Sequence, residues 1–556
     1  MSFVAFALDH RPTPTSIYRQ YIQADPSHKP LRFTPGKTQM HPLPWPRDQW
    51  TVHKSAVKDA RGMVAAQHVL AAEAGAKLLR CGGNAVDAAV AAALTLAVVE
   101  PWMCGLGGSG FMVVWLAREQ RAVALDFQGV LPRALTVADY PVDPDLPPTL
   151  MGFPAVKDWR NTRGASAATL PGAVAGLSHA AQTYGKRGFG AALDPAITLA
   201  ETGIPASWYT TLLIATEAEV ISIDPASSSI YMPRGRPLQI GERLFIPRLA
   251  KTLSRLRDHG AADFYHGQIG ESLVADLRAG GNRITMQDLA EYQVIDRPAM
   301  QARHRGADLY TAGPQSGGQR LCDMLAHVSG AMPTPPERPT PETWLVYANA
   351  LETAWRAHRI KNGTLAEVGA HTSSLSAADT EGNMVALTYT ILDHFGCGVT
   401  LPGTGILMNN GVSYFDPRPG LNTTMQGGKR INSSNMCPTV GVRDGQAVFA
   451  IGASGGDLIM PAVAQIAALM LDFDMTLEEA LHSPRLDASH RGSVRADPRL
   501  GQAVLDQLGA HHRLEIASND VGPKLYAFPS GVAWENGMLS GLSDPFQPDS
   551  NARGQG

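Results

Sequence analysis

Apolar positions recur along this chain with two different periods, and the changes of period separate helical from extended segments. Val64–Leu79 has helical spacing that ends at a Gly-Gly pair, and Asn84 can cap a second helix, Ala85–Val98. The runs FMVVWL and AVALDF then read as two strands of a hairpin joined by REQR. Helical spacing returns from Leu170 to about Glu291.

The second half of the chain adds more strands than helices. A helix is predicted over Trp344–Arg359, and Leu375–Thr390 alternates like a strand pair around a turn at 380–383. GTGILMNNGVSYF predicts another strand and turn, and Asp444-Gly445 marks a hairpin. Two helices are expected to close the core. Helices and antiparallel hairpins in this order predict an α+β fold, because alternating βαβ units are missing.

The composition argues against a nucleic-acid-binding, membrane-spanning, secreted or metal-binding protein. The 556 residues are 44% apolar and 17% charged with a net charge of −3, so we expect a globular protein without a nucleic-acid-binding footprint. Ala85–Val99, the longest apolar run, is too short for a membrane span, and no signal peptide is recognised at the N-terminus. Five scattered cysteines without C-x-x-C favour reduced thiols in a cytoplasmic protein, and no metal site or cofactor is predicted. Residues 1–60 hold eight prolines and predict an irregular N-terminal arm.

One short motif suggests a serine nucleophile. Gly452 to Gly456 fits G-x-S-x-G around Ser454, with an apolar strand before it and a helical pattern after it. That elbow belongs to mostly parallel sheets, whereas this sequence predicts antiparallel ones. His482, Asp487 and His490 lie downstream and could complete a triad. In the required order, Asp487 and His490 are only three residues apart. The serine-elbow hydrolase is therefore kept as a minor alternative.

A longer set of motifs carries a family resemblance. GAHTSSLSAADTEGNMVALTYT resembles the gamma-glutamyltranspeptidase family of N-terminal nucleophile hydrolases, and further matching blocks lie in order between Arg61 and Asp487. The blocks include the helix and glycine loop of Gly82–Met112 and the segments LPGAVAGL, AGPQSGGQ, NNGVSYFDPRPG, GKRINSSNMCPT and GASGGDLI. The residues that match the first motif are Thr372, Ser373, Ser376, Asp379, Gly382, Asn383, Val385, Ala386, Thr388 and Thr390.

The resemblance implies a four-layer αββα fold and a proenzyme that cuts itself between His371 and Thr372. It implies a large chain, 61–371 after the arm, and a small chain, 372–556, that stay packed together as a heterodimer. The chemistry needs this cut, because a threonine hydroxyl is a poor nucleophile until a base takes its proton. A free α-amino group, with a pKa near 7.7–8.0, is such a base and sits on the same residue.

The resemblance also implies roles for other residues. Thr390 matches the hydroxyl that hydrogen-bonds the nucleophile, and Gly455 and Gly456 match the pair whose N–H groups face the oxyanion. Ser454 is then a neighbour in the loop. Ser433 and Ser434 match a serine pair near the substrate, although both could instead be ordinary turn residues.

The gamma-glutamyl pocket of the family is altered in this sequence. The positions that bind the amino-acid head group hold Gln128, Leu392, Gly411 and Tyr414. Gln cannot supply the charge of the family's arginine, and Leu offers no hydrogen bond, so gamma-glutamyl compounds are expected to be poor substrates. Arg133, Asp393 or Asp416 could compensate from other directions. The tether before Thr372 is also short, which could help or prevent cleavage.

The sequence therefore predicts a self-processing threonine amidohydrolase (acylase or small-amide type) that acts on a small-molecule amide without a gamma-glutamyl group. One alternative is a gamma-glutamyl hydrolase or transferase with a rebuilt pocket. Another is an uncleaved, non-catalytic binding protein of the same fold. Association of processed units into a homo-oligomer is left open.

Overall fold

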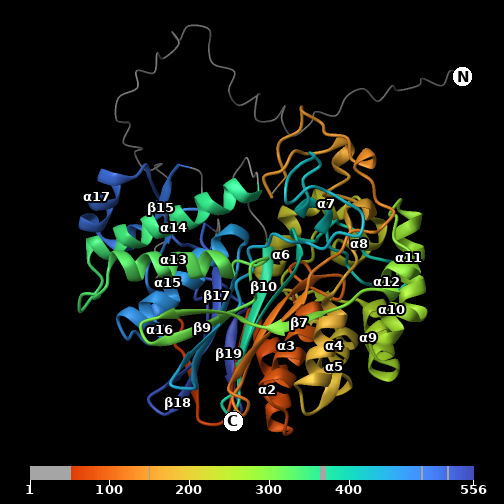
Figure 1. Ribbon diagram of the computed structural model, residues 1–556. Coiled ribbons are helices and arrows are strands. Elements are labelled where there is room, and N and C mark those ends of the chain that lie inside the picture. The colour runs from red at the N-terminus through yellow and green to blue at the C-terminus, as the bar shows by residue number, and fades with distance from the viewer. Residues whose placement is uncertain (1–51, 150, 363–370, 490–491, 522–524) are drawn as a thin grey trace, which may run out of the picture. The chain divides into compact units, whose positions relative to one another are not determined.

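Two antiparallel seven-stranded sheets are the centre of the structure, a computed structural model that describes residues 52–149, 151–362, 371–489, 492–521 and 525–556 (Figure 1). Small apolar residues from both sheets, among them Ala65, Ala386 and Ala450, are buried together between the sheets. The first sheet has the order β1 (Val57–Asp59), β18 (Met538–Ser543), β17 (Phe528–Glu535), β13 (Gln446–Ser454), β12 (Thr439–Arg443), β9 (Ala307–Thr311), β8 (Met300–His304). The second has the order β19 (Asn551–Gly554), β2 (Met63–Ala66), β10 (His371–Ala378), β11 (Met384–Leu392), β3 (Ser109–Leu116), β4 (Arg121–Phe127), β7 (Ile295–Pro298).

Helices from the first half of the chain cover the outer face of the second sheet. Their apolar side chains form one buried cluster with strands β3, β4, β10 and β11. α3 is buried along its whole length, and Asn84 caps it in a capping box with Asp87. These helices are α2 (Val69–Arg80), α3 (Ala85–Val99), α4 (Ala173–Thr183), α5 (Gly188–Thr202), α6 (Trp208–Thr216), α7 (Ala218–Ile221), α8 (Pro225–Tyr231), α9 (Pro247–His259), α10 (Ala262–His266), α11 (Gln268–Ala279) and α12 (Met286–Ala290).

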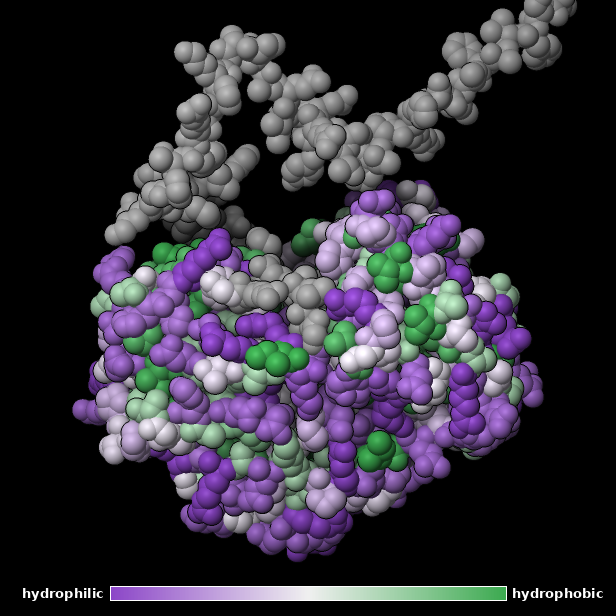
Figure 2. All heavy atoms as spheres, turned by 45° about the horizontal axis from the view of Figure 1, so that its top comes forward, coloured by the Kyte–Doolittle hydropathy of each residue, from purple (hydrophilic) through white to green (hydrophobic). Residues whose placement is uncertain are grey.

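Five helices pack on the first sheet in the same way and complete the four layers, which confirms the predicted αββα fold. They are α13 (Gly318–Ala331), α14 (Pro341–Asn362), α15 (Ile459–Asp472), α16 (Leu477–His482) and α17 (Gln502–His511). Two minor sheets join β5 (Ile204–Pro205) to β6 (Arg243–Leu244), and β14 (Leu486–Asp487) to β15 (Val494–Ala496) and β16 (Leu514–Ile516). Hydrophilic residues dominate the face shown in Figure 2, with apolar residues scattered among them.

Both sheets contain strands from either side of the bond between His371 and Thr372. β10 and β11 lie between β2 and β3, and β12 pairs with β9. β18 and β19 in turn pair with β1 and β2. Fragments 1–371 and 372–556 would therefore share two hydrogen-bonded sheets, which would hold them together after a cut at this bond.

Several predicted elements differ from the structure. The predicted helix Val64–Leu79 is in fact β2 followed by α2, and Val57–Asp59, inside the predicted irregular arm, form β1; residues 1–51 lie outside the described residues. GTGILMNNGVSYF forms isolated bridges and a short 3-10 turn at Gly411–Tyr414, where a strand was predicted. The hairpin β17–β18 was not predicted. No helix within the described ranges is long and apolar enough to cross a membrane.

Candidate active site

Thr372 lies at the beginning of β10, where the pairing with β11 is irregular. His371 is opposite Leu392 and Ser373 is opposite Tyr389, so the bulge between them places Thr372 against Thr390 and Ile391. Thr372 is 2% exposed and Thr390 is 1% exposed. The Thr390 hydroxyl accepts a hydrogen bond of 2.7 Å from the Leu392 N–H, which fixes its oxygen at the end of the strand. The two threonines selected from the sequence therefore meet on adjacent strands.

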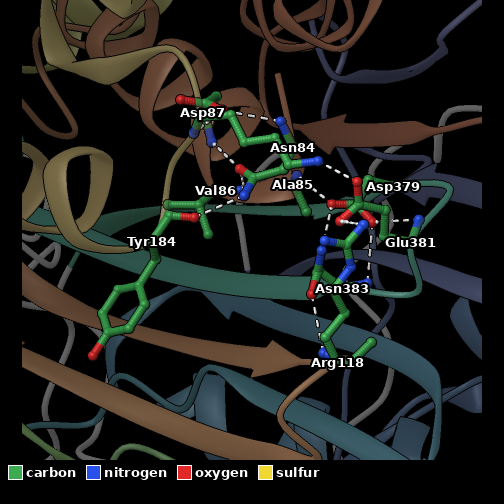
Figure 3. A network of polar contacts seen from close by, with 11 residues as sticks. Asn84, Ala85, Val86, Asp87, Arg118, Tyr184, Asp379, Glu381 and Asn383 are labelled. Atoms are coloured by element: carbon green, nitrogen blue, oxygen red, sulfur yellow. Dashed lines mark hydrogen bonds and ion pairs between the residues drawn. The ribbon is translucent and has the colours of Figure 1, made fainter. Parts of the chain in front are cut away.

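The turn that joins β10 to β11 is tied to the first buried helix (Figure 3). Asp379 accepts hydrogen bonds from the backbone N–H of Ala85 (2.8 Å) and from the Asn383 side chain (2.9 Å). The Asn383 side chain in turn accepts from the Ala117 N–H (3.0 Å), between β3 and β4. The negative charge of Asp379 also interacts favourably with the dipole of α3, because it lies at the N-terminal end of this helix. The Asp-x-x-Gly-Asn part of the motif thus anchors the strand that carries Thr372.

The Gly455-Gly456 pair forms a turn between β13 and α15. Gly455 has a φ of +128° and Gly456 a φ of +59°, conformations that favour glycine. β13 packs across the two sheets onto the strands of the threonines, because a Cβ on Gly452 would lie 2.4 Å from the Ser374 Oγ and 3.0 Å from the Thr388 Oγ1. The turn therefore lies at the end of a strand that faces β10 and β11.

Ser454 does not have the surroundings of an activated serine. Its Oγ is buried and makes no hydrogen bond to the part of the chain that the structure describes, so no base contacts it there. His482 is engaged elsewhere, since its Nε2 accepts from the Lys54 N–H and its Nδ1 lies 2.8 Å from the Glu478 carbonyl. Asp487 bonds Ser489, and His490 lies outside the described residues.

The serine pair is connected to the glycine turn by side chains that the sequence reasoning missed. Arg320, on α13, donates from Nη2 to the Ser434 carbonyl (2.9 Å) and to the Asn435 side chain (2.8 Å). Asn435 donates to the carboxylate of Asp457, the residue after Gly456. Arg320 lies on the same buried face of α13 as Leu321, Met324 and Leu325. A charged residue on the apolar face of a helix is rare, and this could have marked Arg320 in the sequence.

The residues at the altered head-group positions lie in two different environments. Leu392, with a φ of +84°, and Tyr414 belong to one apolar cluster. The other members of the cluster are Leu131, Leu135, Tyr140, Met151, Phe153, Val156, Val412, Phe415, Met425 and Ile431. Burial raises the pKa of the Tyr414 hydroxyl, which lies within hydrogen-bonding reach of Ser434. This side of the candidate site is therefore apolar and does not resemble a receptor for a zwitterion.

Gly411 and Gly129, the residue after Gln128, both lie close to Thr169. A Cβ on Gly129 would lie 2.3 Å from the Thr169 Oγ1, and a Cβ on Gly411 would lie 2.6 Å from the same atom. The Gln128 side chain is fully buried, and neither of its amide atoms has a hydrogen-bond partner among the described residues. A buried amide without partners costs free energy, so this position is suited to a ligand or an ordered water.

The three residues expected to compensate for the altered pocket are already engaged. Arg133 forms an ion pair with Glu291, and Asp416 accepts two hydrogen bonds from the Arg418 guanidinium. Asp393 accepts from the Asn410 side chain (2.7 Å), and burial raises the pKa of its carboxyl to about 7. Its other oxygen, Oδ1, is buried without a partner among the described residues, so compensation by Asp393 stays a prediction.

A buried acid lies behind the strand of Thr372. Ser373 donates from its hydroxyl to Glu100 (3.3 Å), at the C-terminal end of α3, and the Gln547 side chain donates to the other oxygen (3.2 Å). Burial, with the nearby charge of Asp549, raises the pKa of the Glu100 carboxyl to about 8. The sequence gave no reason to select Glu100. No cluster suited to a metal ion occurs among the described side chains.

Comparison with known proteins agrees with this geometry. The family model described as Gamma-glutamyltranspeptidase matches residues 71–364 and 358–553. The Acylase ACY 1 proenzyme of Pseudomonas sp. (strain SE83) is 30% identical over 541 residues, which cover 90% of this chain and 95% of the relative. The Glutathione hydrolase proenzyme of Escherichia coli (strain K12) is 30% identical over 551 residues, 90% of this chain and 92% of the relative.

A solved structure shares the fold. The cephalosporin acylase from Bacillus halodurans superposes with a TM-score of 0.79 over 93% of this chain and 99% of its own, at 24% identity. That likeness supports the four-layer arrangement and carries no information on substrate.

Proposed function

Because this chain belongs to the gamma-glutamyltranspeptidase family, we propose that it is a self-processing threonine amidohydrolase whose substrate is an amide without a gamma-glutamyl head group. It cuts itself between His371 and Thr372, and the two fragments stay associated as a heterodimer. Association of these heterodimers into a homo-oligomer and a cytoplasmic location are further expectations of the same proposal.

Self-cleavage starts from the hydroxyl of Thr372 and the carbonyl of His371. The Thr372 hydroxyl attacks the carbonyl carbon of His371, the C–N bond breaks, and the acyl group moves from nitrogen to oxygen as an ester. Water then hydrolyses the ester, which leaves a carboxylate on His371 and a free α-amino group on Thr372. That amine is protonated at low pH and becomes a usable base near neutral pH.

The mature enzyme repeats the attack on a substrate amide. The α-amino group takes the proton of the Thr372 hydroxyl as its oxygen attacks the carbonyl carbon, and the same proton passes to the leaving amine. The N–H groups of Gly455 and Gly456 stabilise the oxyanion, and Thr390 holds the attacking oxygen in place. Each oxyanion donor contributes about 3–4 kcal/mol to the transition state. Water then hydrolyses the acyl ester and regenerates the hydroxyl.

One observation supports this reaction above all, the bulge that places Thr372 against Thr390 at the end of adjacent buried strands. The substrate class is supported by the apolar surroundings of Leu392 and Tyr414, and by the relative named as an acylase proenzyme.

The first alternative is a gamma-glutamyl hydrolase or transferase. It is favoured by the relatives named as glutathione hydrolase proenzymes and by the unpartnered amide of Gln128, which could face a head group. The uncleaved binding protein is the second alternative, and it predicts an intact chain.

Intact-mass analysis and a denaturing gel separate these readings. We expect fragments of 371 and 185 residues from the wild type and one uncut band from Thr372→Ala. The protein is then given p-nitroanilides of gamma-glutamate and of simple acyl groups, and the small fragment should gain the mass of a simple acyl group. Faster release of p-nitroaniline from the gamma-glutamyl anilide than from the simple acyl anilides would favour the first alternative. An uncut wild-type chain without turnover would refute both enzymatic readings.

A further inference from the structure

A small polar pocket lies beside the serine pair, between the N-terminal end of α13 and the C-terminal end of α14. Its volume is about 100 Å³, and its lining includes Ser433, Asn432, Gln319, Arg320 and Lys361. Ser433 is half-buried, and its hydroxyl makes no hydrogen bond within the ranges that the structure describes. The pocket therefore opens next to a residue that the family resemblance places near the substrate.

Arg320 is a buried cation without a carboxylate partner. Its side chain is 2% exposed, and its guanidinium contacts no described carboxylate directly. The carboxylate of Asp457 lies one hydrogen bond away, through Asn435, and acts to raise the pKa of Arg320. Nη2 donates to two neutral oxygens, those of Ser434 and Asn435, Nη1 donates to the His358 ring (2.8 Å), and Nε has no acceptor at all. A buried charge in this condition is costly unless an anion joins it.

The groups that touch the Arg320 guanidinium are neutral, and Asp457 acts on it only through Asn435. Burial lowers the pKa of Arg320 to about 10, so the group is still protonated at neutral pH. Burial and the adjacent guanidinium also lower the pKa of His358, so its ring is neutral. Its Trp355 neighbour lies face-on at 4.7 Å and supplies only a π face.

The rest of the lining is also electropositive. Lys361, in the last turn of α14, is exposed and has no ion pair or hydrogen bond to the described residues. Asp323, the one acid in the lining, is exposed and is hydrogen-bonded to Gln319 (2.8 Å). The N-terminal end of α13, a helix of 14 residues, adds the positive end of its dipole. Two cations and a helix N-terminus thus face one acid.

We propose that this pocket binds a carboxylate of the amide substrate, with Arg320 and Lys361 as its anion receptor. The inference rests on the proposed function and names its substrate class. Arg320 is also the residue that positions Ser434 and, through Asn435, the acid next to Gly456. A carboxylate held there would be at a fixed place relative to the oxyanion turn. The positive charge of Arg320 would then take the place of the arginine charge that is missing at Gln128.

Two substrate pairs test the proposal and show which side of the amide carries the carboxylate. The acyl-side pair is the p-nitroanilide of a dicarboxylic acid and its methyl ester. The amine-side pair is an acyl anilide with and without a ring carboxylate. We expect kcat/KM to be about tenfold higher for the acid in one of the pairs, mainly through KM. Equal values in both pairs, with clear turnover, would overturn the pocket assignment and leave the proposed amidohydrolase intact.

Variants connect the preference to these residues. Lys361→Met should lower the acid-to-neutral ratio by about fivefold, since one exposed charge is lost. Lys77→Met is the matched control and should keep the ratio, because it removes a lysine of the last turn of α2 that has no partner among the described residues. Arg320→Lys keeps a positive charge and loses the planar guanidinium, so the ratio should fall further. Self-cleavage and circular dichroism show whether this variant still folds. A preference that survives both Lys361→Met and Arg320→Lys would refute the assignment.

Discussion

Substitution of Gly455 by alanine tests the oxyanion turn directly. Gly455 has a φ of +128°, a conformation that L-residues rarely adopt, and an added Cβ would lie 3.1 Å from the Ala527 Cα. The backbone strain costs about 1–3 kcal/mol. This is less than the roughly 5–15 kcal/mol that stabilises a typical domain, so the variant should fold with a lower Tm.

Activity should fall much more than stability. Relief of the strain rotates the peptide and turns the N–H groups of the turn away from the oxyanion. Loss of one such donor costs about 10²–10³ in kcat. We expect the same donors to stabilise the oxyanion that forms during self-cleavage, so precursor should also accumulate on a denaturing gel.

Gly537→Ala is the matched control. Gly537 has a φ of +79° in the β17–β18 turn, and nothing lies near its added Cβ, so this variant should lose about 1–2 kcal/mol of stability through backbone strain. Its kcat, measured with the anilide that the wild type prefers, should stay at the wild-type value. A Gly455→Ala enzyme that cleaves itself and turns over at the wild-type kcat would refute the role of this turn.

Three further predictions concern the surroundings of the nucleophile. Thr390→Val removes the acceptor of the Leu392 N–H and should slow self-cleavage by about tenfold or more in a time course on a denaturing gel, where an unchanged rate would contradict its role. Glu100 has its pKa raised from 4.5 to about 8, so the folded state holds a proton that the unfolded state releases. The free energy of unfolding should therefore decline between about pH 4.5 and 8, and Glu100→Gln should flatten that decline in a Tm-against-pH series. Gly452→Ala places a Cβ 2.4 Å from the Ser374 Oγ and should cost about 1–3 kcal/mol, seen as a lower Tm, whereas Gly330→Ala on the exposed face of α13 should not lower it.

The sequence pattern correctly predicted those helices and strands whose formation depends on residues close together in the chain. The hairpins β3–β4 and β12–β13 follow from alternation and turn residues, and α3 follows from its cap and its apolar run. The segment Val64–Ala66 was misread, because three buried small or β-branched residues before a helix fit a helical period as well as a strand. Only the pairing of β2 with β10 and β19, both distant in sequence, makes it a strand.

Some residues of the candidate site could be predicted from the sequence, and others could be found only in the structure. Thr372, Thr390 and the Gly455-Gly456 turn were selected from motifs because each motif is a short run of residues. Glu100 could not be selected, and Arg320 was marked only by its place on the apolar face of a helix, because the role of an isolated charge depends on its buried neighbours. Their roles depend on contacts between residues more than 100 positions apart.

The central claim is that a free amine on Thr372 is the base of this enzyme. N-terminal sequencing of purified protein, with the active sites counted by acyl labelling, tests it most directly. We expect a second sequence that begins Thr-Ser-Ser-Leu, in an amount equal to the number of labelled sites. Fully active protein without that N-terminus would contradict the account.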